Sequence, residues 1–477
     1  MGSAPDVYAQ LRSDLKGTEA EVLTPDSEGY RESLQRWSEH CVKEAQAVVK
    51  VTSASDITKT LHFVKTNKIP IVVKGGGHST SGSSSISDGL VIDLSKMRNV
   101  TVDPAAKTIT AQGGTIWADV DNAAAEHGLA TVGGTVNHTG VGGLTLGGGY
   151  GYLTGAHGLT IDNLLSVSIV LASGTQVTAS PTSNSDLFWA VRGAGQNFGV
   201  VTSFTFRAIP QPHPVFAGPL IFLPDKLPQV VTFANKFHEQ NNEDAALMWG
   251  FSCPPPANAP VVLTMLFYNG PEDAARAFFA DLWDLGPVAD MSGVVPYATV
   301  NSLLNANAGF DGRKQFGGGA FKLPMSPAFV EALFGEWLQF VSGHEGMNES
   351  LMLFETIPYG KVREVANESC SFSNRGDYYN IGTVFKWFDP ELDEVVREFS
   401  RGLLRKASQS AGVEQDEEIR GKEGVGVYGN YSNNDVSAQD VYGSNTKRLE
   451  ELKHKYDPDN LFDRGTRLVP RPLVVVN

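Results

Sequence analysis

Two glycine-rich stretches, about 60 residues apart, limit what this chain can fold into more than any other feature. The first is Gly75-Gly76-Gly77, which follows an apolar stretch and precedes His78 and Ser79. The second, at 133–151, has nine glycines among its nineteen residues. Glycine loses more backbone entropy on folding than other residues, so this density indicates a bound ligand or very close packing of the backbone. Both stretches are therefore candidate ligand-binding loops.

The composition excludes several classes of function. The 477 residues leave room for two or three domains with a large core. The formal charge of −15 repels the phosphates of nucleic acids and anionic membranes. No apolar stretch reaches the ~18 residues of a membrane helix, and the first ten residues lack the apolar core of a secretory signal. We therefore expect a cytoplasmic protein with no nucleic-acid or membrane partner, as a monomer or homodimer.

The three cysteines, Cys41, Cys253 and Cys370, are far apart in the sequence. No C-x-x-C pair and no Cys/His cluster is present, so no metal site is expected. We interpret the cysteines as buried free thiols, although one disulfide remains possible.

The hydrophobic pattern predicts an α+β protein. A proline-rich segment at 210–214 marks a domain boundary. Before it, strands are expected at 47–51, 71–73, 90–94, 100–103, 108–111, 165–172, 176–179 and 200–207, and helices at 6–16, 115–124, 186–192 and after Ser53. After it, strands are expected at 219–223, 246–252, 261–268, 351–355 and 379–387, and helices at 272–285, 327–341, 390–407 and 444–455. The second pattern suits an antiparallel sheet backed by helices.

Two glycine-rich segments, 193–199 and 142–151, do not fit a nicotinamide site. In a dinucleotide-binding fingerprint the glycines follow a strand and open a helix. The glycines at 193, 195 and 199 follow an expected helix and open an expected strand, which is the inverse order. The segment 142–151 lacks both the preceding strand and an acidic residue about 20 positions later.

Three motifs in order resemble the berberine bridge enzyme-like family, within the vanillyl-alcohol oxidase/PCMH flavoprotein superfamily. They are the G-G-H-S of 76–79, the G-x-G-G-x-x-x-G-G-G-Y-G of 140–151 and the Y-x-N-Y of 428–431; the D-P-x-N-x-F of 457–462 is a further hallmark. The resemblance implies a two-domain PCMH-type FAD-binding fold with a discontinuous flavin domain. That domain would comprise 1–210 and a returning segment at 423–477, on either side of an antiparallel-sheet substrate-binding domain at 211–422.

The same resemblance implies that FAD is attached covalently to His78. Many relatives add a second bond from a cysteine, but Val136 holds that position here, and valine cannot form a thioether. We therefore expect attachment through His78 only; non-covalent FAD beside His78 is the alternative. The other expected cofactor-binding residues are Lys74, Gly75, Gly76, Gly77, Ser79, His138, Thr139, Gly142, Gly143, Gly199, Val200 and Asn430.

Tyr428 and His138 are the candidate catalytic residues. The family tyrosine at position 428 helps to deprotonate the substrate, but a phenol with a pKa near ~10 needs a depressed pKa or an adjacent acceptor to do so. The family's acidic partner position aligns with Gly382, so the expected base is missing. Tyr428 either has another partner or is a pocket wall, and His138 lies either at the flavin edge or in the core. Glu355, on an expected strand, receives no role.

These residues predict an FAD-linked oxidase. It would remove hydride from a C–H bond beside oxygen or nitrogen of a small metabolite, in secondary metabolism by association, and pass the electrons to O2. A dehydrogenase with another acceptor, a flavoprotein that catalyses a net non-redox cyclisation and a non-enzymatic binding module remain as alternatives.

Overall fold

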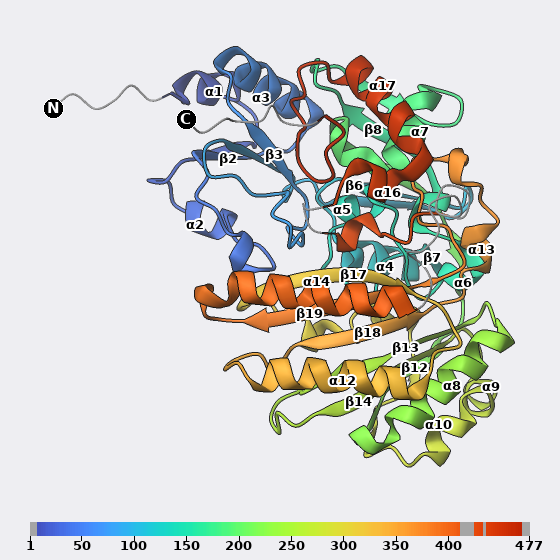
Figure 1. The fold of residues 1–477 in the computed structure, drawn as a ribbon. Coiled ribbons are helices and arrows are strands. Elements are labelled where there is room, and N and C mark those ends of the chain that lie inside the picture. The colour runs from blue at the N-terminus through green and yellow to red at the C-terminus, as the bar shows by residue number, and fades with distance from the viewer. Residues whose placement is uncertain (1–6, 411–423, 433–435, 470–477) are drawn as a thin grey trace.

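The structure is a computed structural model that describes residues 7–410, 424–432 and 436–469. The expected boundary at 422 lies outside these residues. The sheets sort into two halves, an upper and a lower one in the view of Figure 1.

The first sheet of the upper half is mainly parallel. Its order is β1-β2-β4-β3, and β4 pairs in parallel with both β2 and β3. The strands are β1 (Glu21–Leu23), β2 (Ala47–Lys50), β3 (Ile71–Lys74) and β4 (Leu90–Asp93). The short helices before β2 are α1 (Ala9–Asp14) and α2 (Tyr30–Ser33), and α3 (Ala54–Asn67) joins β2 to β3. The Ser53 hydroxyl accepts a hydrogen bond from the Asp56 N–H at the start of α3, which confirms the expected helix cap.

The second sheet of the upper half is antiparallel, in the order β5-β6-β10-β8-β9. Its strands are β5 (Val100–Asp103), β6 (Thr108–Gln112), β8 (Leu164–Val170), β9 (Gln176–Ala179) and β10 (Val200–Arg207). A two-stranded pair joins β7 (Leu129–Ala130) to β11 (Ile209–Pro210). The helices of this region are α4 (Trp117–Ala125), α5 (Val141–Leu146), α6 (Thr154–His157) and α7 (Ser185–Ala194).

The lower half is built on one eight-stranded antiparallel sheet. Its order is β15-β12-β14-β13-β18-β19-β17, and β16 pairs with β12. The strands are β12 (Val215–Phe222), β13 (Ala245–Ser252), β14 (Val261–Tyr268), β15 (Ala289–Asp290), β16 (Gly293–Val295), β17 (Arg313–Phe321), β18 (Leu351–Thr356) and β19 (Tyr379–Trp387). The helices are α8 (Leu227–Gln240), α9 (Glu272–Phe278), α10 (Ala280–Asp284), α11 (Tyr297–Val300), α12 (Pro327–Ser342), α13 (Gly360–Arg363) and α14 (Asp393–Ser410).

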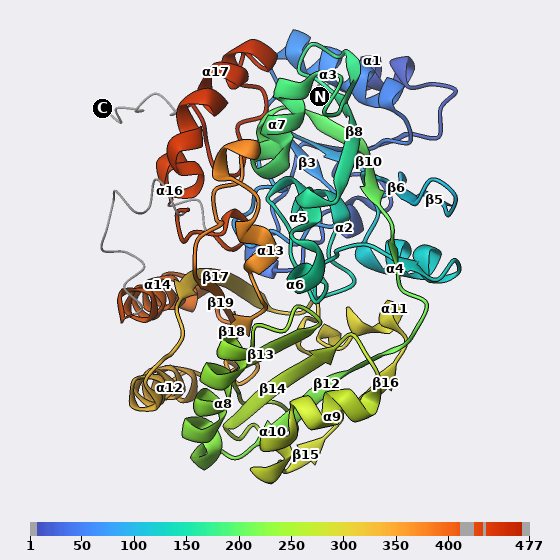
Figure 2. The ribbon, with the colours of Figure 1, turned by 90° about the vertical axis from the view of Figure 1, so that its right-hand side faces the viewer.

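The three longest helices of the lower half cover one face of the large sheet, whereas the short helix α11 packs on the other face, at β12 and β14. Figure 2 shows α8, α12 and α14 side by side along the face that they cover. Because side chains alternate across a strand, Met352 and Phe354 of β18 pack into the core beneath the helices. Leu351, Leu353 and Glu355 of the same strand point to the opposite face, which looks toward the upper half.

The C-terminal segment returns to the upper half. The segment passes through η8 (Gly429–Tyr431), α16 (Ala438–Tyr442) and α17 (Thr446–Tyr456), and α17 lies against α7. The buried Lys453 ammonium is 2.7 Å from an Asp457 carboxylate oxygen and donates to the Asn197 carbonyl at 2.8 Å. Asp457 in turn accepts from the Phe462 N–H at 2.8 Å. The D-P-x-N-x-F hallmark therefore holds the tail on the upper half.

The α+β fold with an antiparallel sheet backed by helices is confirmed, but several elements differ from expectation. The strand expected at 219–223 is β12, which begins at Val215. The helix expected at 272–285 is broken at Phe279, whose φ and ψ are −97° and 11°. Helix α8 and strand β17 were not expected, and the second glycine-rich stretch contains a short helix, α5.

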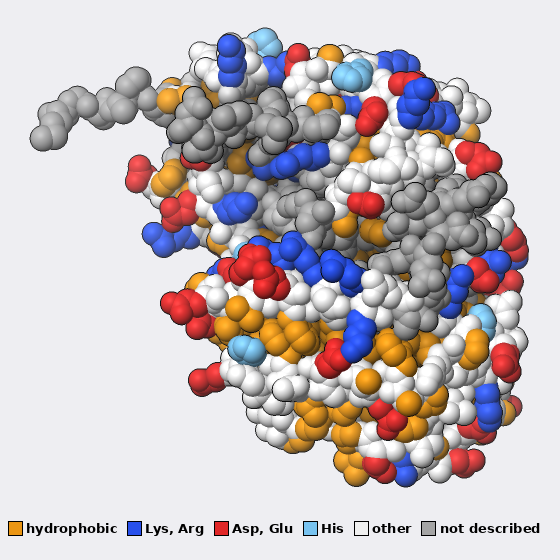
Figure 3. Space-filling model, viewed as in Figure 1, with side chains coloured by type: hydrophobic (Ala, Val, Ile, Leu, Met, Phe, Trp, Pro, Cys, Tyr) orange, Lys and Arg blue, Asp and Glu red, His pale blue; other side chains and the backbone are white. Residues whose placement is uncertain are grey.

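Acidic and basic side chains are interspersed over the face seen in Figure 3. In the part of the chain that the structure describes, no helix is both long enough and apolar enough to cross a bilayer.

Candidate active site

A cavity of about 380 Å³ lies between the two halves. One wall comes from the loop after β3, which contains the first glycine-rich stretch, and from the second glycine-rich stretch. The opposite wall is the helix-free face of β17, β18 and β19. The segment η8 and residues 464–466 close further sides. The cavity thus joins both candidate loops to the sheet of the lower half.

The glycines of the two stretches pack against each other. A Cβ built on Gly76 would lie 2.4 Å from the Gly140 backbone nitrogen, and a Cβ built on Gly140 would lie 2.4 Å from that of Gly76. Gly77 has a φ of +72°, in the region that favours glycine. A Cβ on Gly143 would meet nothing within 4 Å, although Gly143 lines the cavity. The glycine density therefore has two causes: contact between the loops and free space in the cavity.

His78 lies in a stack of rings beside the cavity. Its ring is stacked on Trp37, with centroids 5.2 Å apart and planes at 13°. Its Nε2 lies 2.8 Å from the Nδ1 of His138. Phe310 approaches both imidazoles, at centroid distances of 5.7 and 5.2 Å. Burial, and then the neighbouring His138 and Lys314, lower the pKa of His78 to about 3, so its imidazole is neutral at physiological pH.

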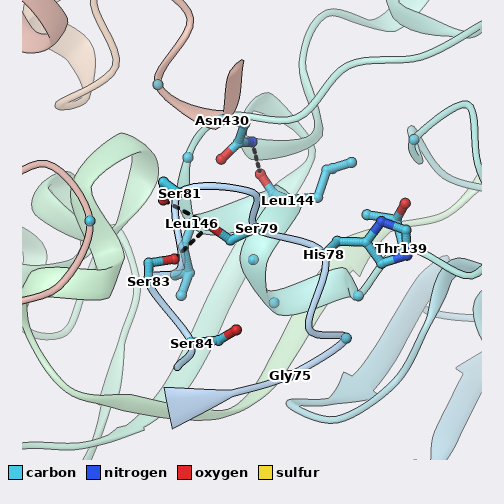
Figure 4. Close-up of a pocket in the computed structure, with 18 of the residues that line it drawn as sticks. Gly75, His78, Ser79, Ser81, Ser83, Ser84, Thr139, Leu144, Leu146 and Asn430 are labelled. Atoms are coloured by element: carbon cyan, nitrogen blue, oxygen red, sulfur yellow. Dashed lines mark hydrogen bonds between the residues drawn. The ribbon is translucent and has the colours of Figure 1, made fainter. Parts of the chain in front are cut away.

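Serine hydroxyls continue the loop after His78. Ser79 and Ser81 are joined through their hydroxyls at 2.8 Å, and the Ser83 hydroxyl donates to that of Ser79 at 2.9 Å (Figure 4). Figure 4 also shows His78 next to Thr139 of the second stretch.

Glu355 is the one carboxylate among the described residues that line the cavity. Its Oε2 accepts a short hydrogen bond from the Tyr150 hydroxyl, and its Oε1 accepts one from the Tyr431 hydroxyl at 3.1 Å. Burial raises the pKa of Glu355 to about 7, although both hydrogen bonds oppose the shift. Burial also holds the pKa of both tyrosines above the ordinary phenol value. Glu355 can therefore gain or lose a proton near neutral pH, whereas the two phenols stay protonated.

Tyr428 has different partners. Its hydroxyl oxygen accepts from the Gly149 N–H at 3.0 Å and from the Asn430 side-chain amide at 2.8 Å. The same amide nitrogen donates to the Leu144 carbonyl at 2.9 Å (Figure 4), which fixes η8 to α5. Burial raises the pKa of Tyr428 above the ordinary phenol value. This is the opposite of the depressed pKa that a base requires.

Gly382 faces the cavity, as the alignment implied, and the carboxylate lies on the adjacent strand. Glu355 of β18 pairs with Asn380 of β19, two residues before Gly382. A Cβ on Gly318, the partner of Gly382 in β17, would lie 2.4 Å from the Cβ of Tyr431. The glycines therefore make room for the Tyr431 ring over the sheet. The carboxyl group of the site comes from Glu355 on the neighbouring strand β18.

Most of the expected site residues line the cavity, but three do not. Those that do are Gly75, Gly76, Gly77, His78, Ser79, Thr139, Gly142, Gly143, Gly199, Tyr428 and Asn430. Lys74 instead binds the buried Asp93 carboxylate at 3.1 Å, and Val200 packs in the core of the upper half. His138 lies behind His78 rather than on the wall. No role for Glu355, Tyr150 or Trp37 was predicted from the sequence.

These residues fit a large cofactor with a flat ring and a polar tail. The glycines leave backbone and free space on one wall, and the hydroxyls of Ser79, Ser81 and Ser83 supply polar groups beside it. Among the described residues, no cluster of side chains suits a metal ion, and all three cysteines are buried and free, as expected.

Comparisons with known proteins also indicate that this protein binds a flavin cofactor, FAD. Residues 45–180 match a family model described as FAD binding domain, and residues 427–464 match one described as Berberine and berberine like. The FAD-linked oxidoreductase pgmH of Aspergillus terreus is 36% identical over 474 residues, which cover 97% of this chain and 95% of that protein. The (R)-6-hydroxynicotine oxidase of Paenarthrobacter nicotinovorans is 29% identical over 466 residues, covering 95% and 97%.

A solved structure shares the fold over nearly its whole length. The 6-hydroxy-D-nicotine oxidase from Arthrobacter nicotinovorans superposes with a TM-score of 0.80 at 27% identity, covering 95% of this chain and 98% of that one. Fold and site thus define an FAD-linked oxidoreductase, and the non-enzymatic binding module is excluded. The chain belongs to the berberine bridge enzyme-like family.

Proposed function

We propose that this enzyme is an oxidase that removes hydride from a C–H bond beside oxygen or nitrogen of a small metabolite. The observation that carries the proposal is the position of Glu355 and its two tyrosines, in the same cavity as the His78 loop. FAD, when bound, accepts the hydride. The protein must then accept the proton that the substrate's O–H or N–H loses.

Glu355 is the proposed proton acceptor, through Tyr431. The Tyr431 hydroxyl donates its proton to Glu355, so its oxygen can accept a hydrogen bond from the substrate. As the substrate proton moves to Tyr431, the Tyr431 proton moves to Glu355. Tyr431 is the better contact of the two tyrosines because it is only partly buried, whereas Tyr150 is buried. Glu355 is an adequate base at neutral pH because its pKa is about 7.

Tyr428 takes the role of a hydrogen-bond donor rather than a base. Its oxygen already accepts two hydrogen bonds, and its own proton has no acceptor among the described residues. It is therefore available to a ligand in the cavity. This revises the catalytic role that the sequence suggested for Tyr428.

His78 is the proposed single point of covalent attachment. Its imidazole is neutral, and in the tautomer whose Nε2–H donates to the Nδ1 of His138, the lone pair for attachment lies on the Nδ1 of His78. Val136 also lines the cavity, but its side chain has no nucleophilic atom. His138 thus supports attachment from behind instead of contacting the substrate.

Dioxygen is the proposed electron acceptor because relatives across the whole chain are named as oxidases. A dehydrogenase with another acceptor would share the site described above. Oxygen uptake separates the two: an oxidase consumes one O2 and forms one H2O2 per substrate oxidised. Turnover without oxygen uptake would instead indicate a dehydrogenase or a net non-redox cyclisation.

The attachment is tested on acid-precipitated and washed protein. We expect a yellow pellet, with the mass of FAD on the His78 peptide and none on the peptide containing Val136. His78→Ala should release all flavin into the supernatant. Flavin free in the wild-type supernatant would contradict covalent attachment, and flavin mass on another peptide would contradict the role of His78.

A further inference from the structure

The cavity-lining face of β17, β18 and β19 forms an apolar floor at one end of the cavity. Leu351 and Leu353 of β18, Val384 of β19 and Phe316 of β17 all line this part. They belong to one apolar cluster, which also includes Trp37. The floor therefore continues from the sheet to the ring that stacks on His78.

The polar groups gather at the other end of the same floor. Leu351, Leu353 and Glu355 alternate along β18, so the floor runs ~13 Å from Leu351 to Glu355 at ~3.3 Å per residue. Besides Glu355, the ionisable side chains on the described cavity wall are His78, Arg464 and tyrosines. The floor thus has a single acidic group, reached across apolar side chains.

Two glycines flatten the middle of this floor. Gly382 of β19 pairs with Leu353 of β18 and with Gly318 of β17. The Tyr431 ring covers Gly318, and the nearest atoms to a Cβ on Gly382 would be those of Phe316, at 3.3 Å, and Tyr431, at 3.7 Å. The two glycines thus let the Phe316 and Tyr431 rings lie close on the sheet, where these rings complete the apolar floor next to Glu355.

We infer that the substrate is an apolar alcohol of two or three rings, whose reacting carbon carries the hydroxyl that meets Tyr431. This inference names the substrate class of the proposed oxidase and rests on that function. The C–H bond of the carbinol carbon breaks and its hydride passes to FAD. The hydroxyl proton passes to Tyr431 while the Tyr431 proton passes to Glu355, and a C=O bond forms. O2 would then take the two electrons and the proton of the hydride, together with the proton from Glu355, to give H2O2.

A sugar does not fit this floor. A disaccharide carries a hydroxyl on most of its carbons, and each one buried without a partner costs about 1–3 kcal/mol. Leu351, Leu353, Val384 and Phe316 offer these hydroxyls no hydrogen-bond partner. Rings that are apolar on both faces have no such cost, and they gain about 25 cal/mol for each Å² of apolar surface removed from water.

The test uses the flavin-loaded enzyme without oxygen and follows the loss of flavin absorbance after rapid mixing. The probes are 2-naphthalenemethanol, benzyl alcohol, cellobiose and xylobiose. We expect the ratio of the limiting reduction rate to Kd to be at least 100-fold higher for 2-naphthalenemethanol than for either disaccharide. It should be at least tenfold higher than for benzyl alcohol, which lacks the second ring.

Matched variants locate the binding surface. Leu353→Asn should raise the Kd of 2-naphthalenemethanol at least tenfold and change the limiting rate by less than threefold. Leu353→Met, which nearly conserves volume, should change the Kd less than twofold. Because the asparagine variant can fail to fold, binding of the non-reacting 2-naphthol to the wild type, seen as a flavin difference spectrum, is a second measurement.

Faster reduction by a disaccharide, or equal reduction by one and two rings, would overturn the substrate class and leave the oxidase intact. So would the lack of a 2-naphthol difference spectrum. Flavin reduction without oxygen uptake in air would instead contradict the proposed function, whichever ligand binds.

Discussion

Two buried carboxyl groups in this protein have the same pKa in very different surroundings. Burial raises the pKa of Glu355 and that of Asp121 to about 7. Glu355 lines the cavity and accepts hydrogen bonds from two tyrosines. Asp121 lies in α4, next to α11 (Figure 2), and accepts one hydrogen bond at 2.9 Å, from Asn301. The Asn301 side-chain carbonyl oxygen is buried and has no hydrogen-bond partner in the described structure.

The difference shows that a perturbed pKa does not by itself mark an active site. Desolvation is the main cause in both cases. Only Glu355 combines it with a free volume and with hydroxyls that can pass on a proton. Asp121 joins a helix of the upper half to a segment of the lower half, so its protonation should affect stability rather than chemistry.

The largest expected effect separates the two carboxyls by activity. Glu355→Gln should lower the limiting rate of flavin reduction by about 10²- to 10⁴-fold, because the amide cannot accept the substrate proton. Asp121→Asn should change that rate by less than about threefold, since Asp121 contacts no part of the cavity. Rapid-mixing measurements on both variants check this. Equal losses would show that Asp121 acts on the reaction, and no loss in Glu355→Gln would remove Glu355 from the mechanism.

The second-largest expected effect is on the free energy of unfolding, and it concerns Asp121. The folded-state pKa of Asp121 lies above its unfolded value of ~3.9, so the protonated carboxyl stabilises the fold fully below about pH 4, and this contribution is lost as the pH rises through about 7. Asparagine cannot ionise, and its amide can donate to the unpartnered oxygen of Asn301. Asp121→Asn should therefore raise the free energy of unfolding at pH 8 by a few kcal/mol and have little effect at pH 4.

Denaturant unfolding at both pH values measures this difference. Glu355→Gln is the matched control, because the pKa of Glu355 is raised in the same direction and its replacement should also stabilise the protein above pH 7. A destabilising effect of Asp121→Asn at pH 8 would mean that the ionised carboxylate has a stabilising partner.

The sequence predicted the glycine-rich loops of the candidate site better than it predicted the carboxyl group of Glu355. The spacing of glycines around His78 and Gly140 located one wall of the cavity, because backbone constraints are local. Glu355 had a weak signal: it is one acid in the apolar strand L-M-L-F-E-T. Its role depends on the register with β19 and on Tyr150 and Tyr431, which are distant in sequence, and such tertiary contacts cannot be derived from a local pattern.

The missed elements of the fold have similar explanations. Strand β17 has three consecutive glycines, which disfavour a strand locally, but a Cβ on Gly317 would lie 2.7 Å from Leu404 of α14. The glycines are needed so that α14 and η8 can pack closely on the two faces. Helix α8 did have a signal, since its buried residues Leu227, Val230, Val231 and Ala234 follow the helical period. The division at 210 and 422 stays a prediction.

The pH dependence of the reaction should follow Glu355 alone. Because the base must be ionised, the rate-to-Kd ratio should fall about tenfold for each pH unit below about 7 and level off above it. The pKa of His78, at about 3, is too low to contribute. In Glu355→Gln the residual activity should lose this dependence. In Asp121→Asn the pH dependence of the reaction should be unchanged. An altered pH midpoint in that variant would show that the ionisation of Asp121 is coupled to that of Glu355.

The smallest expected effect tests whether Tyr428 is a donor or a base. Tyr428→Phe removes the proposed neutral hydrogen bond to the ligand, along with the two bonds that the hydroxyl accepts from Gly149 and Asn430. Because none of these bonds carries the substrate proton, the limiting rate should fall only about 3- to 10-fold, and the pH midpoint should not move. Tyr152→Phe is the matched control: its buried hydroxyl lacks a partner in the described structure and its ring lies outside the cavity wall, so its loss should leave the rate unchanged. A loss in Tyr428→Phe as large as in Glu355→Gln would return Tyr428 to the role of base. The acid-base function would then belong to Tyr428, just before η8, and Glu355 would only modulate it through Tyr431.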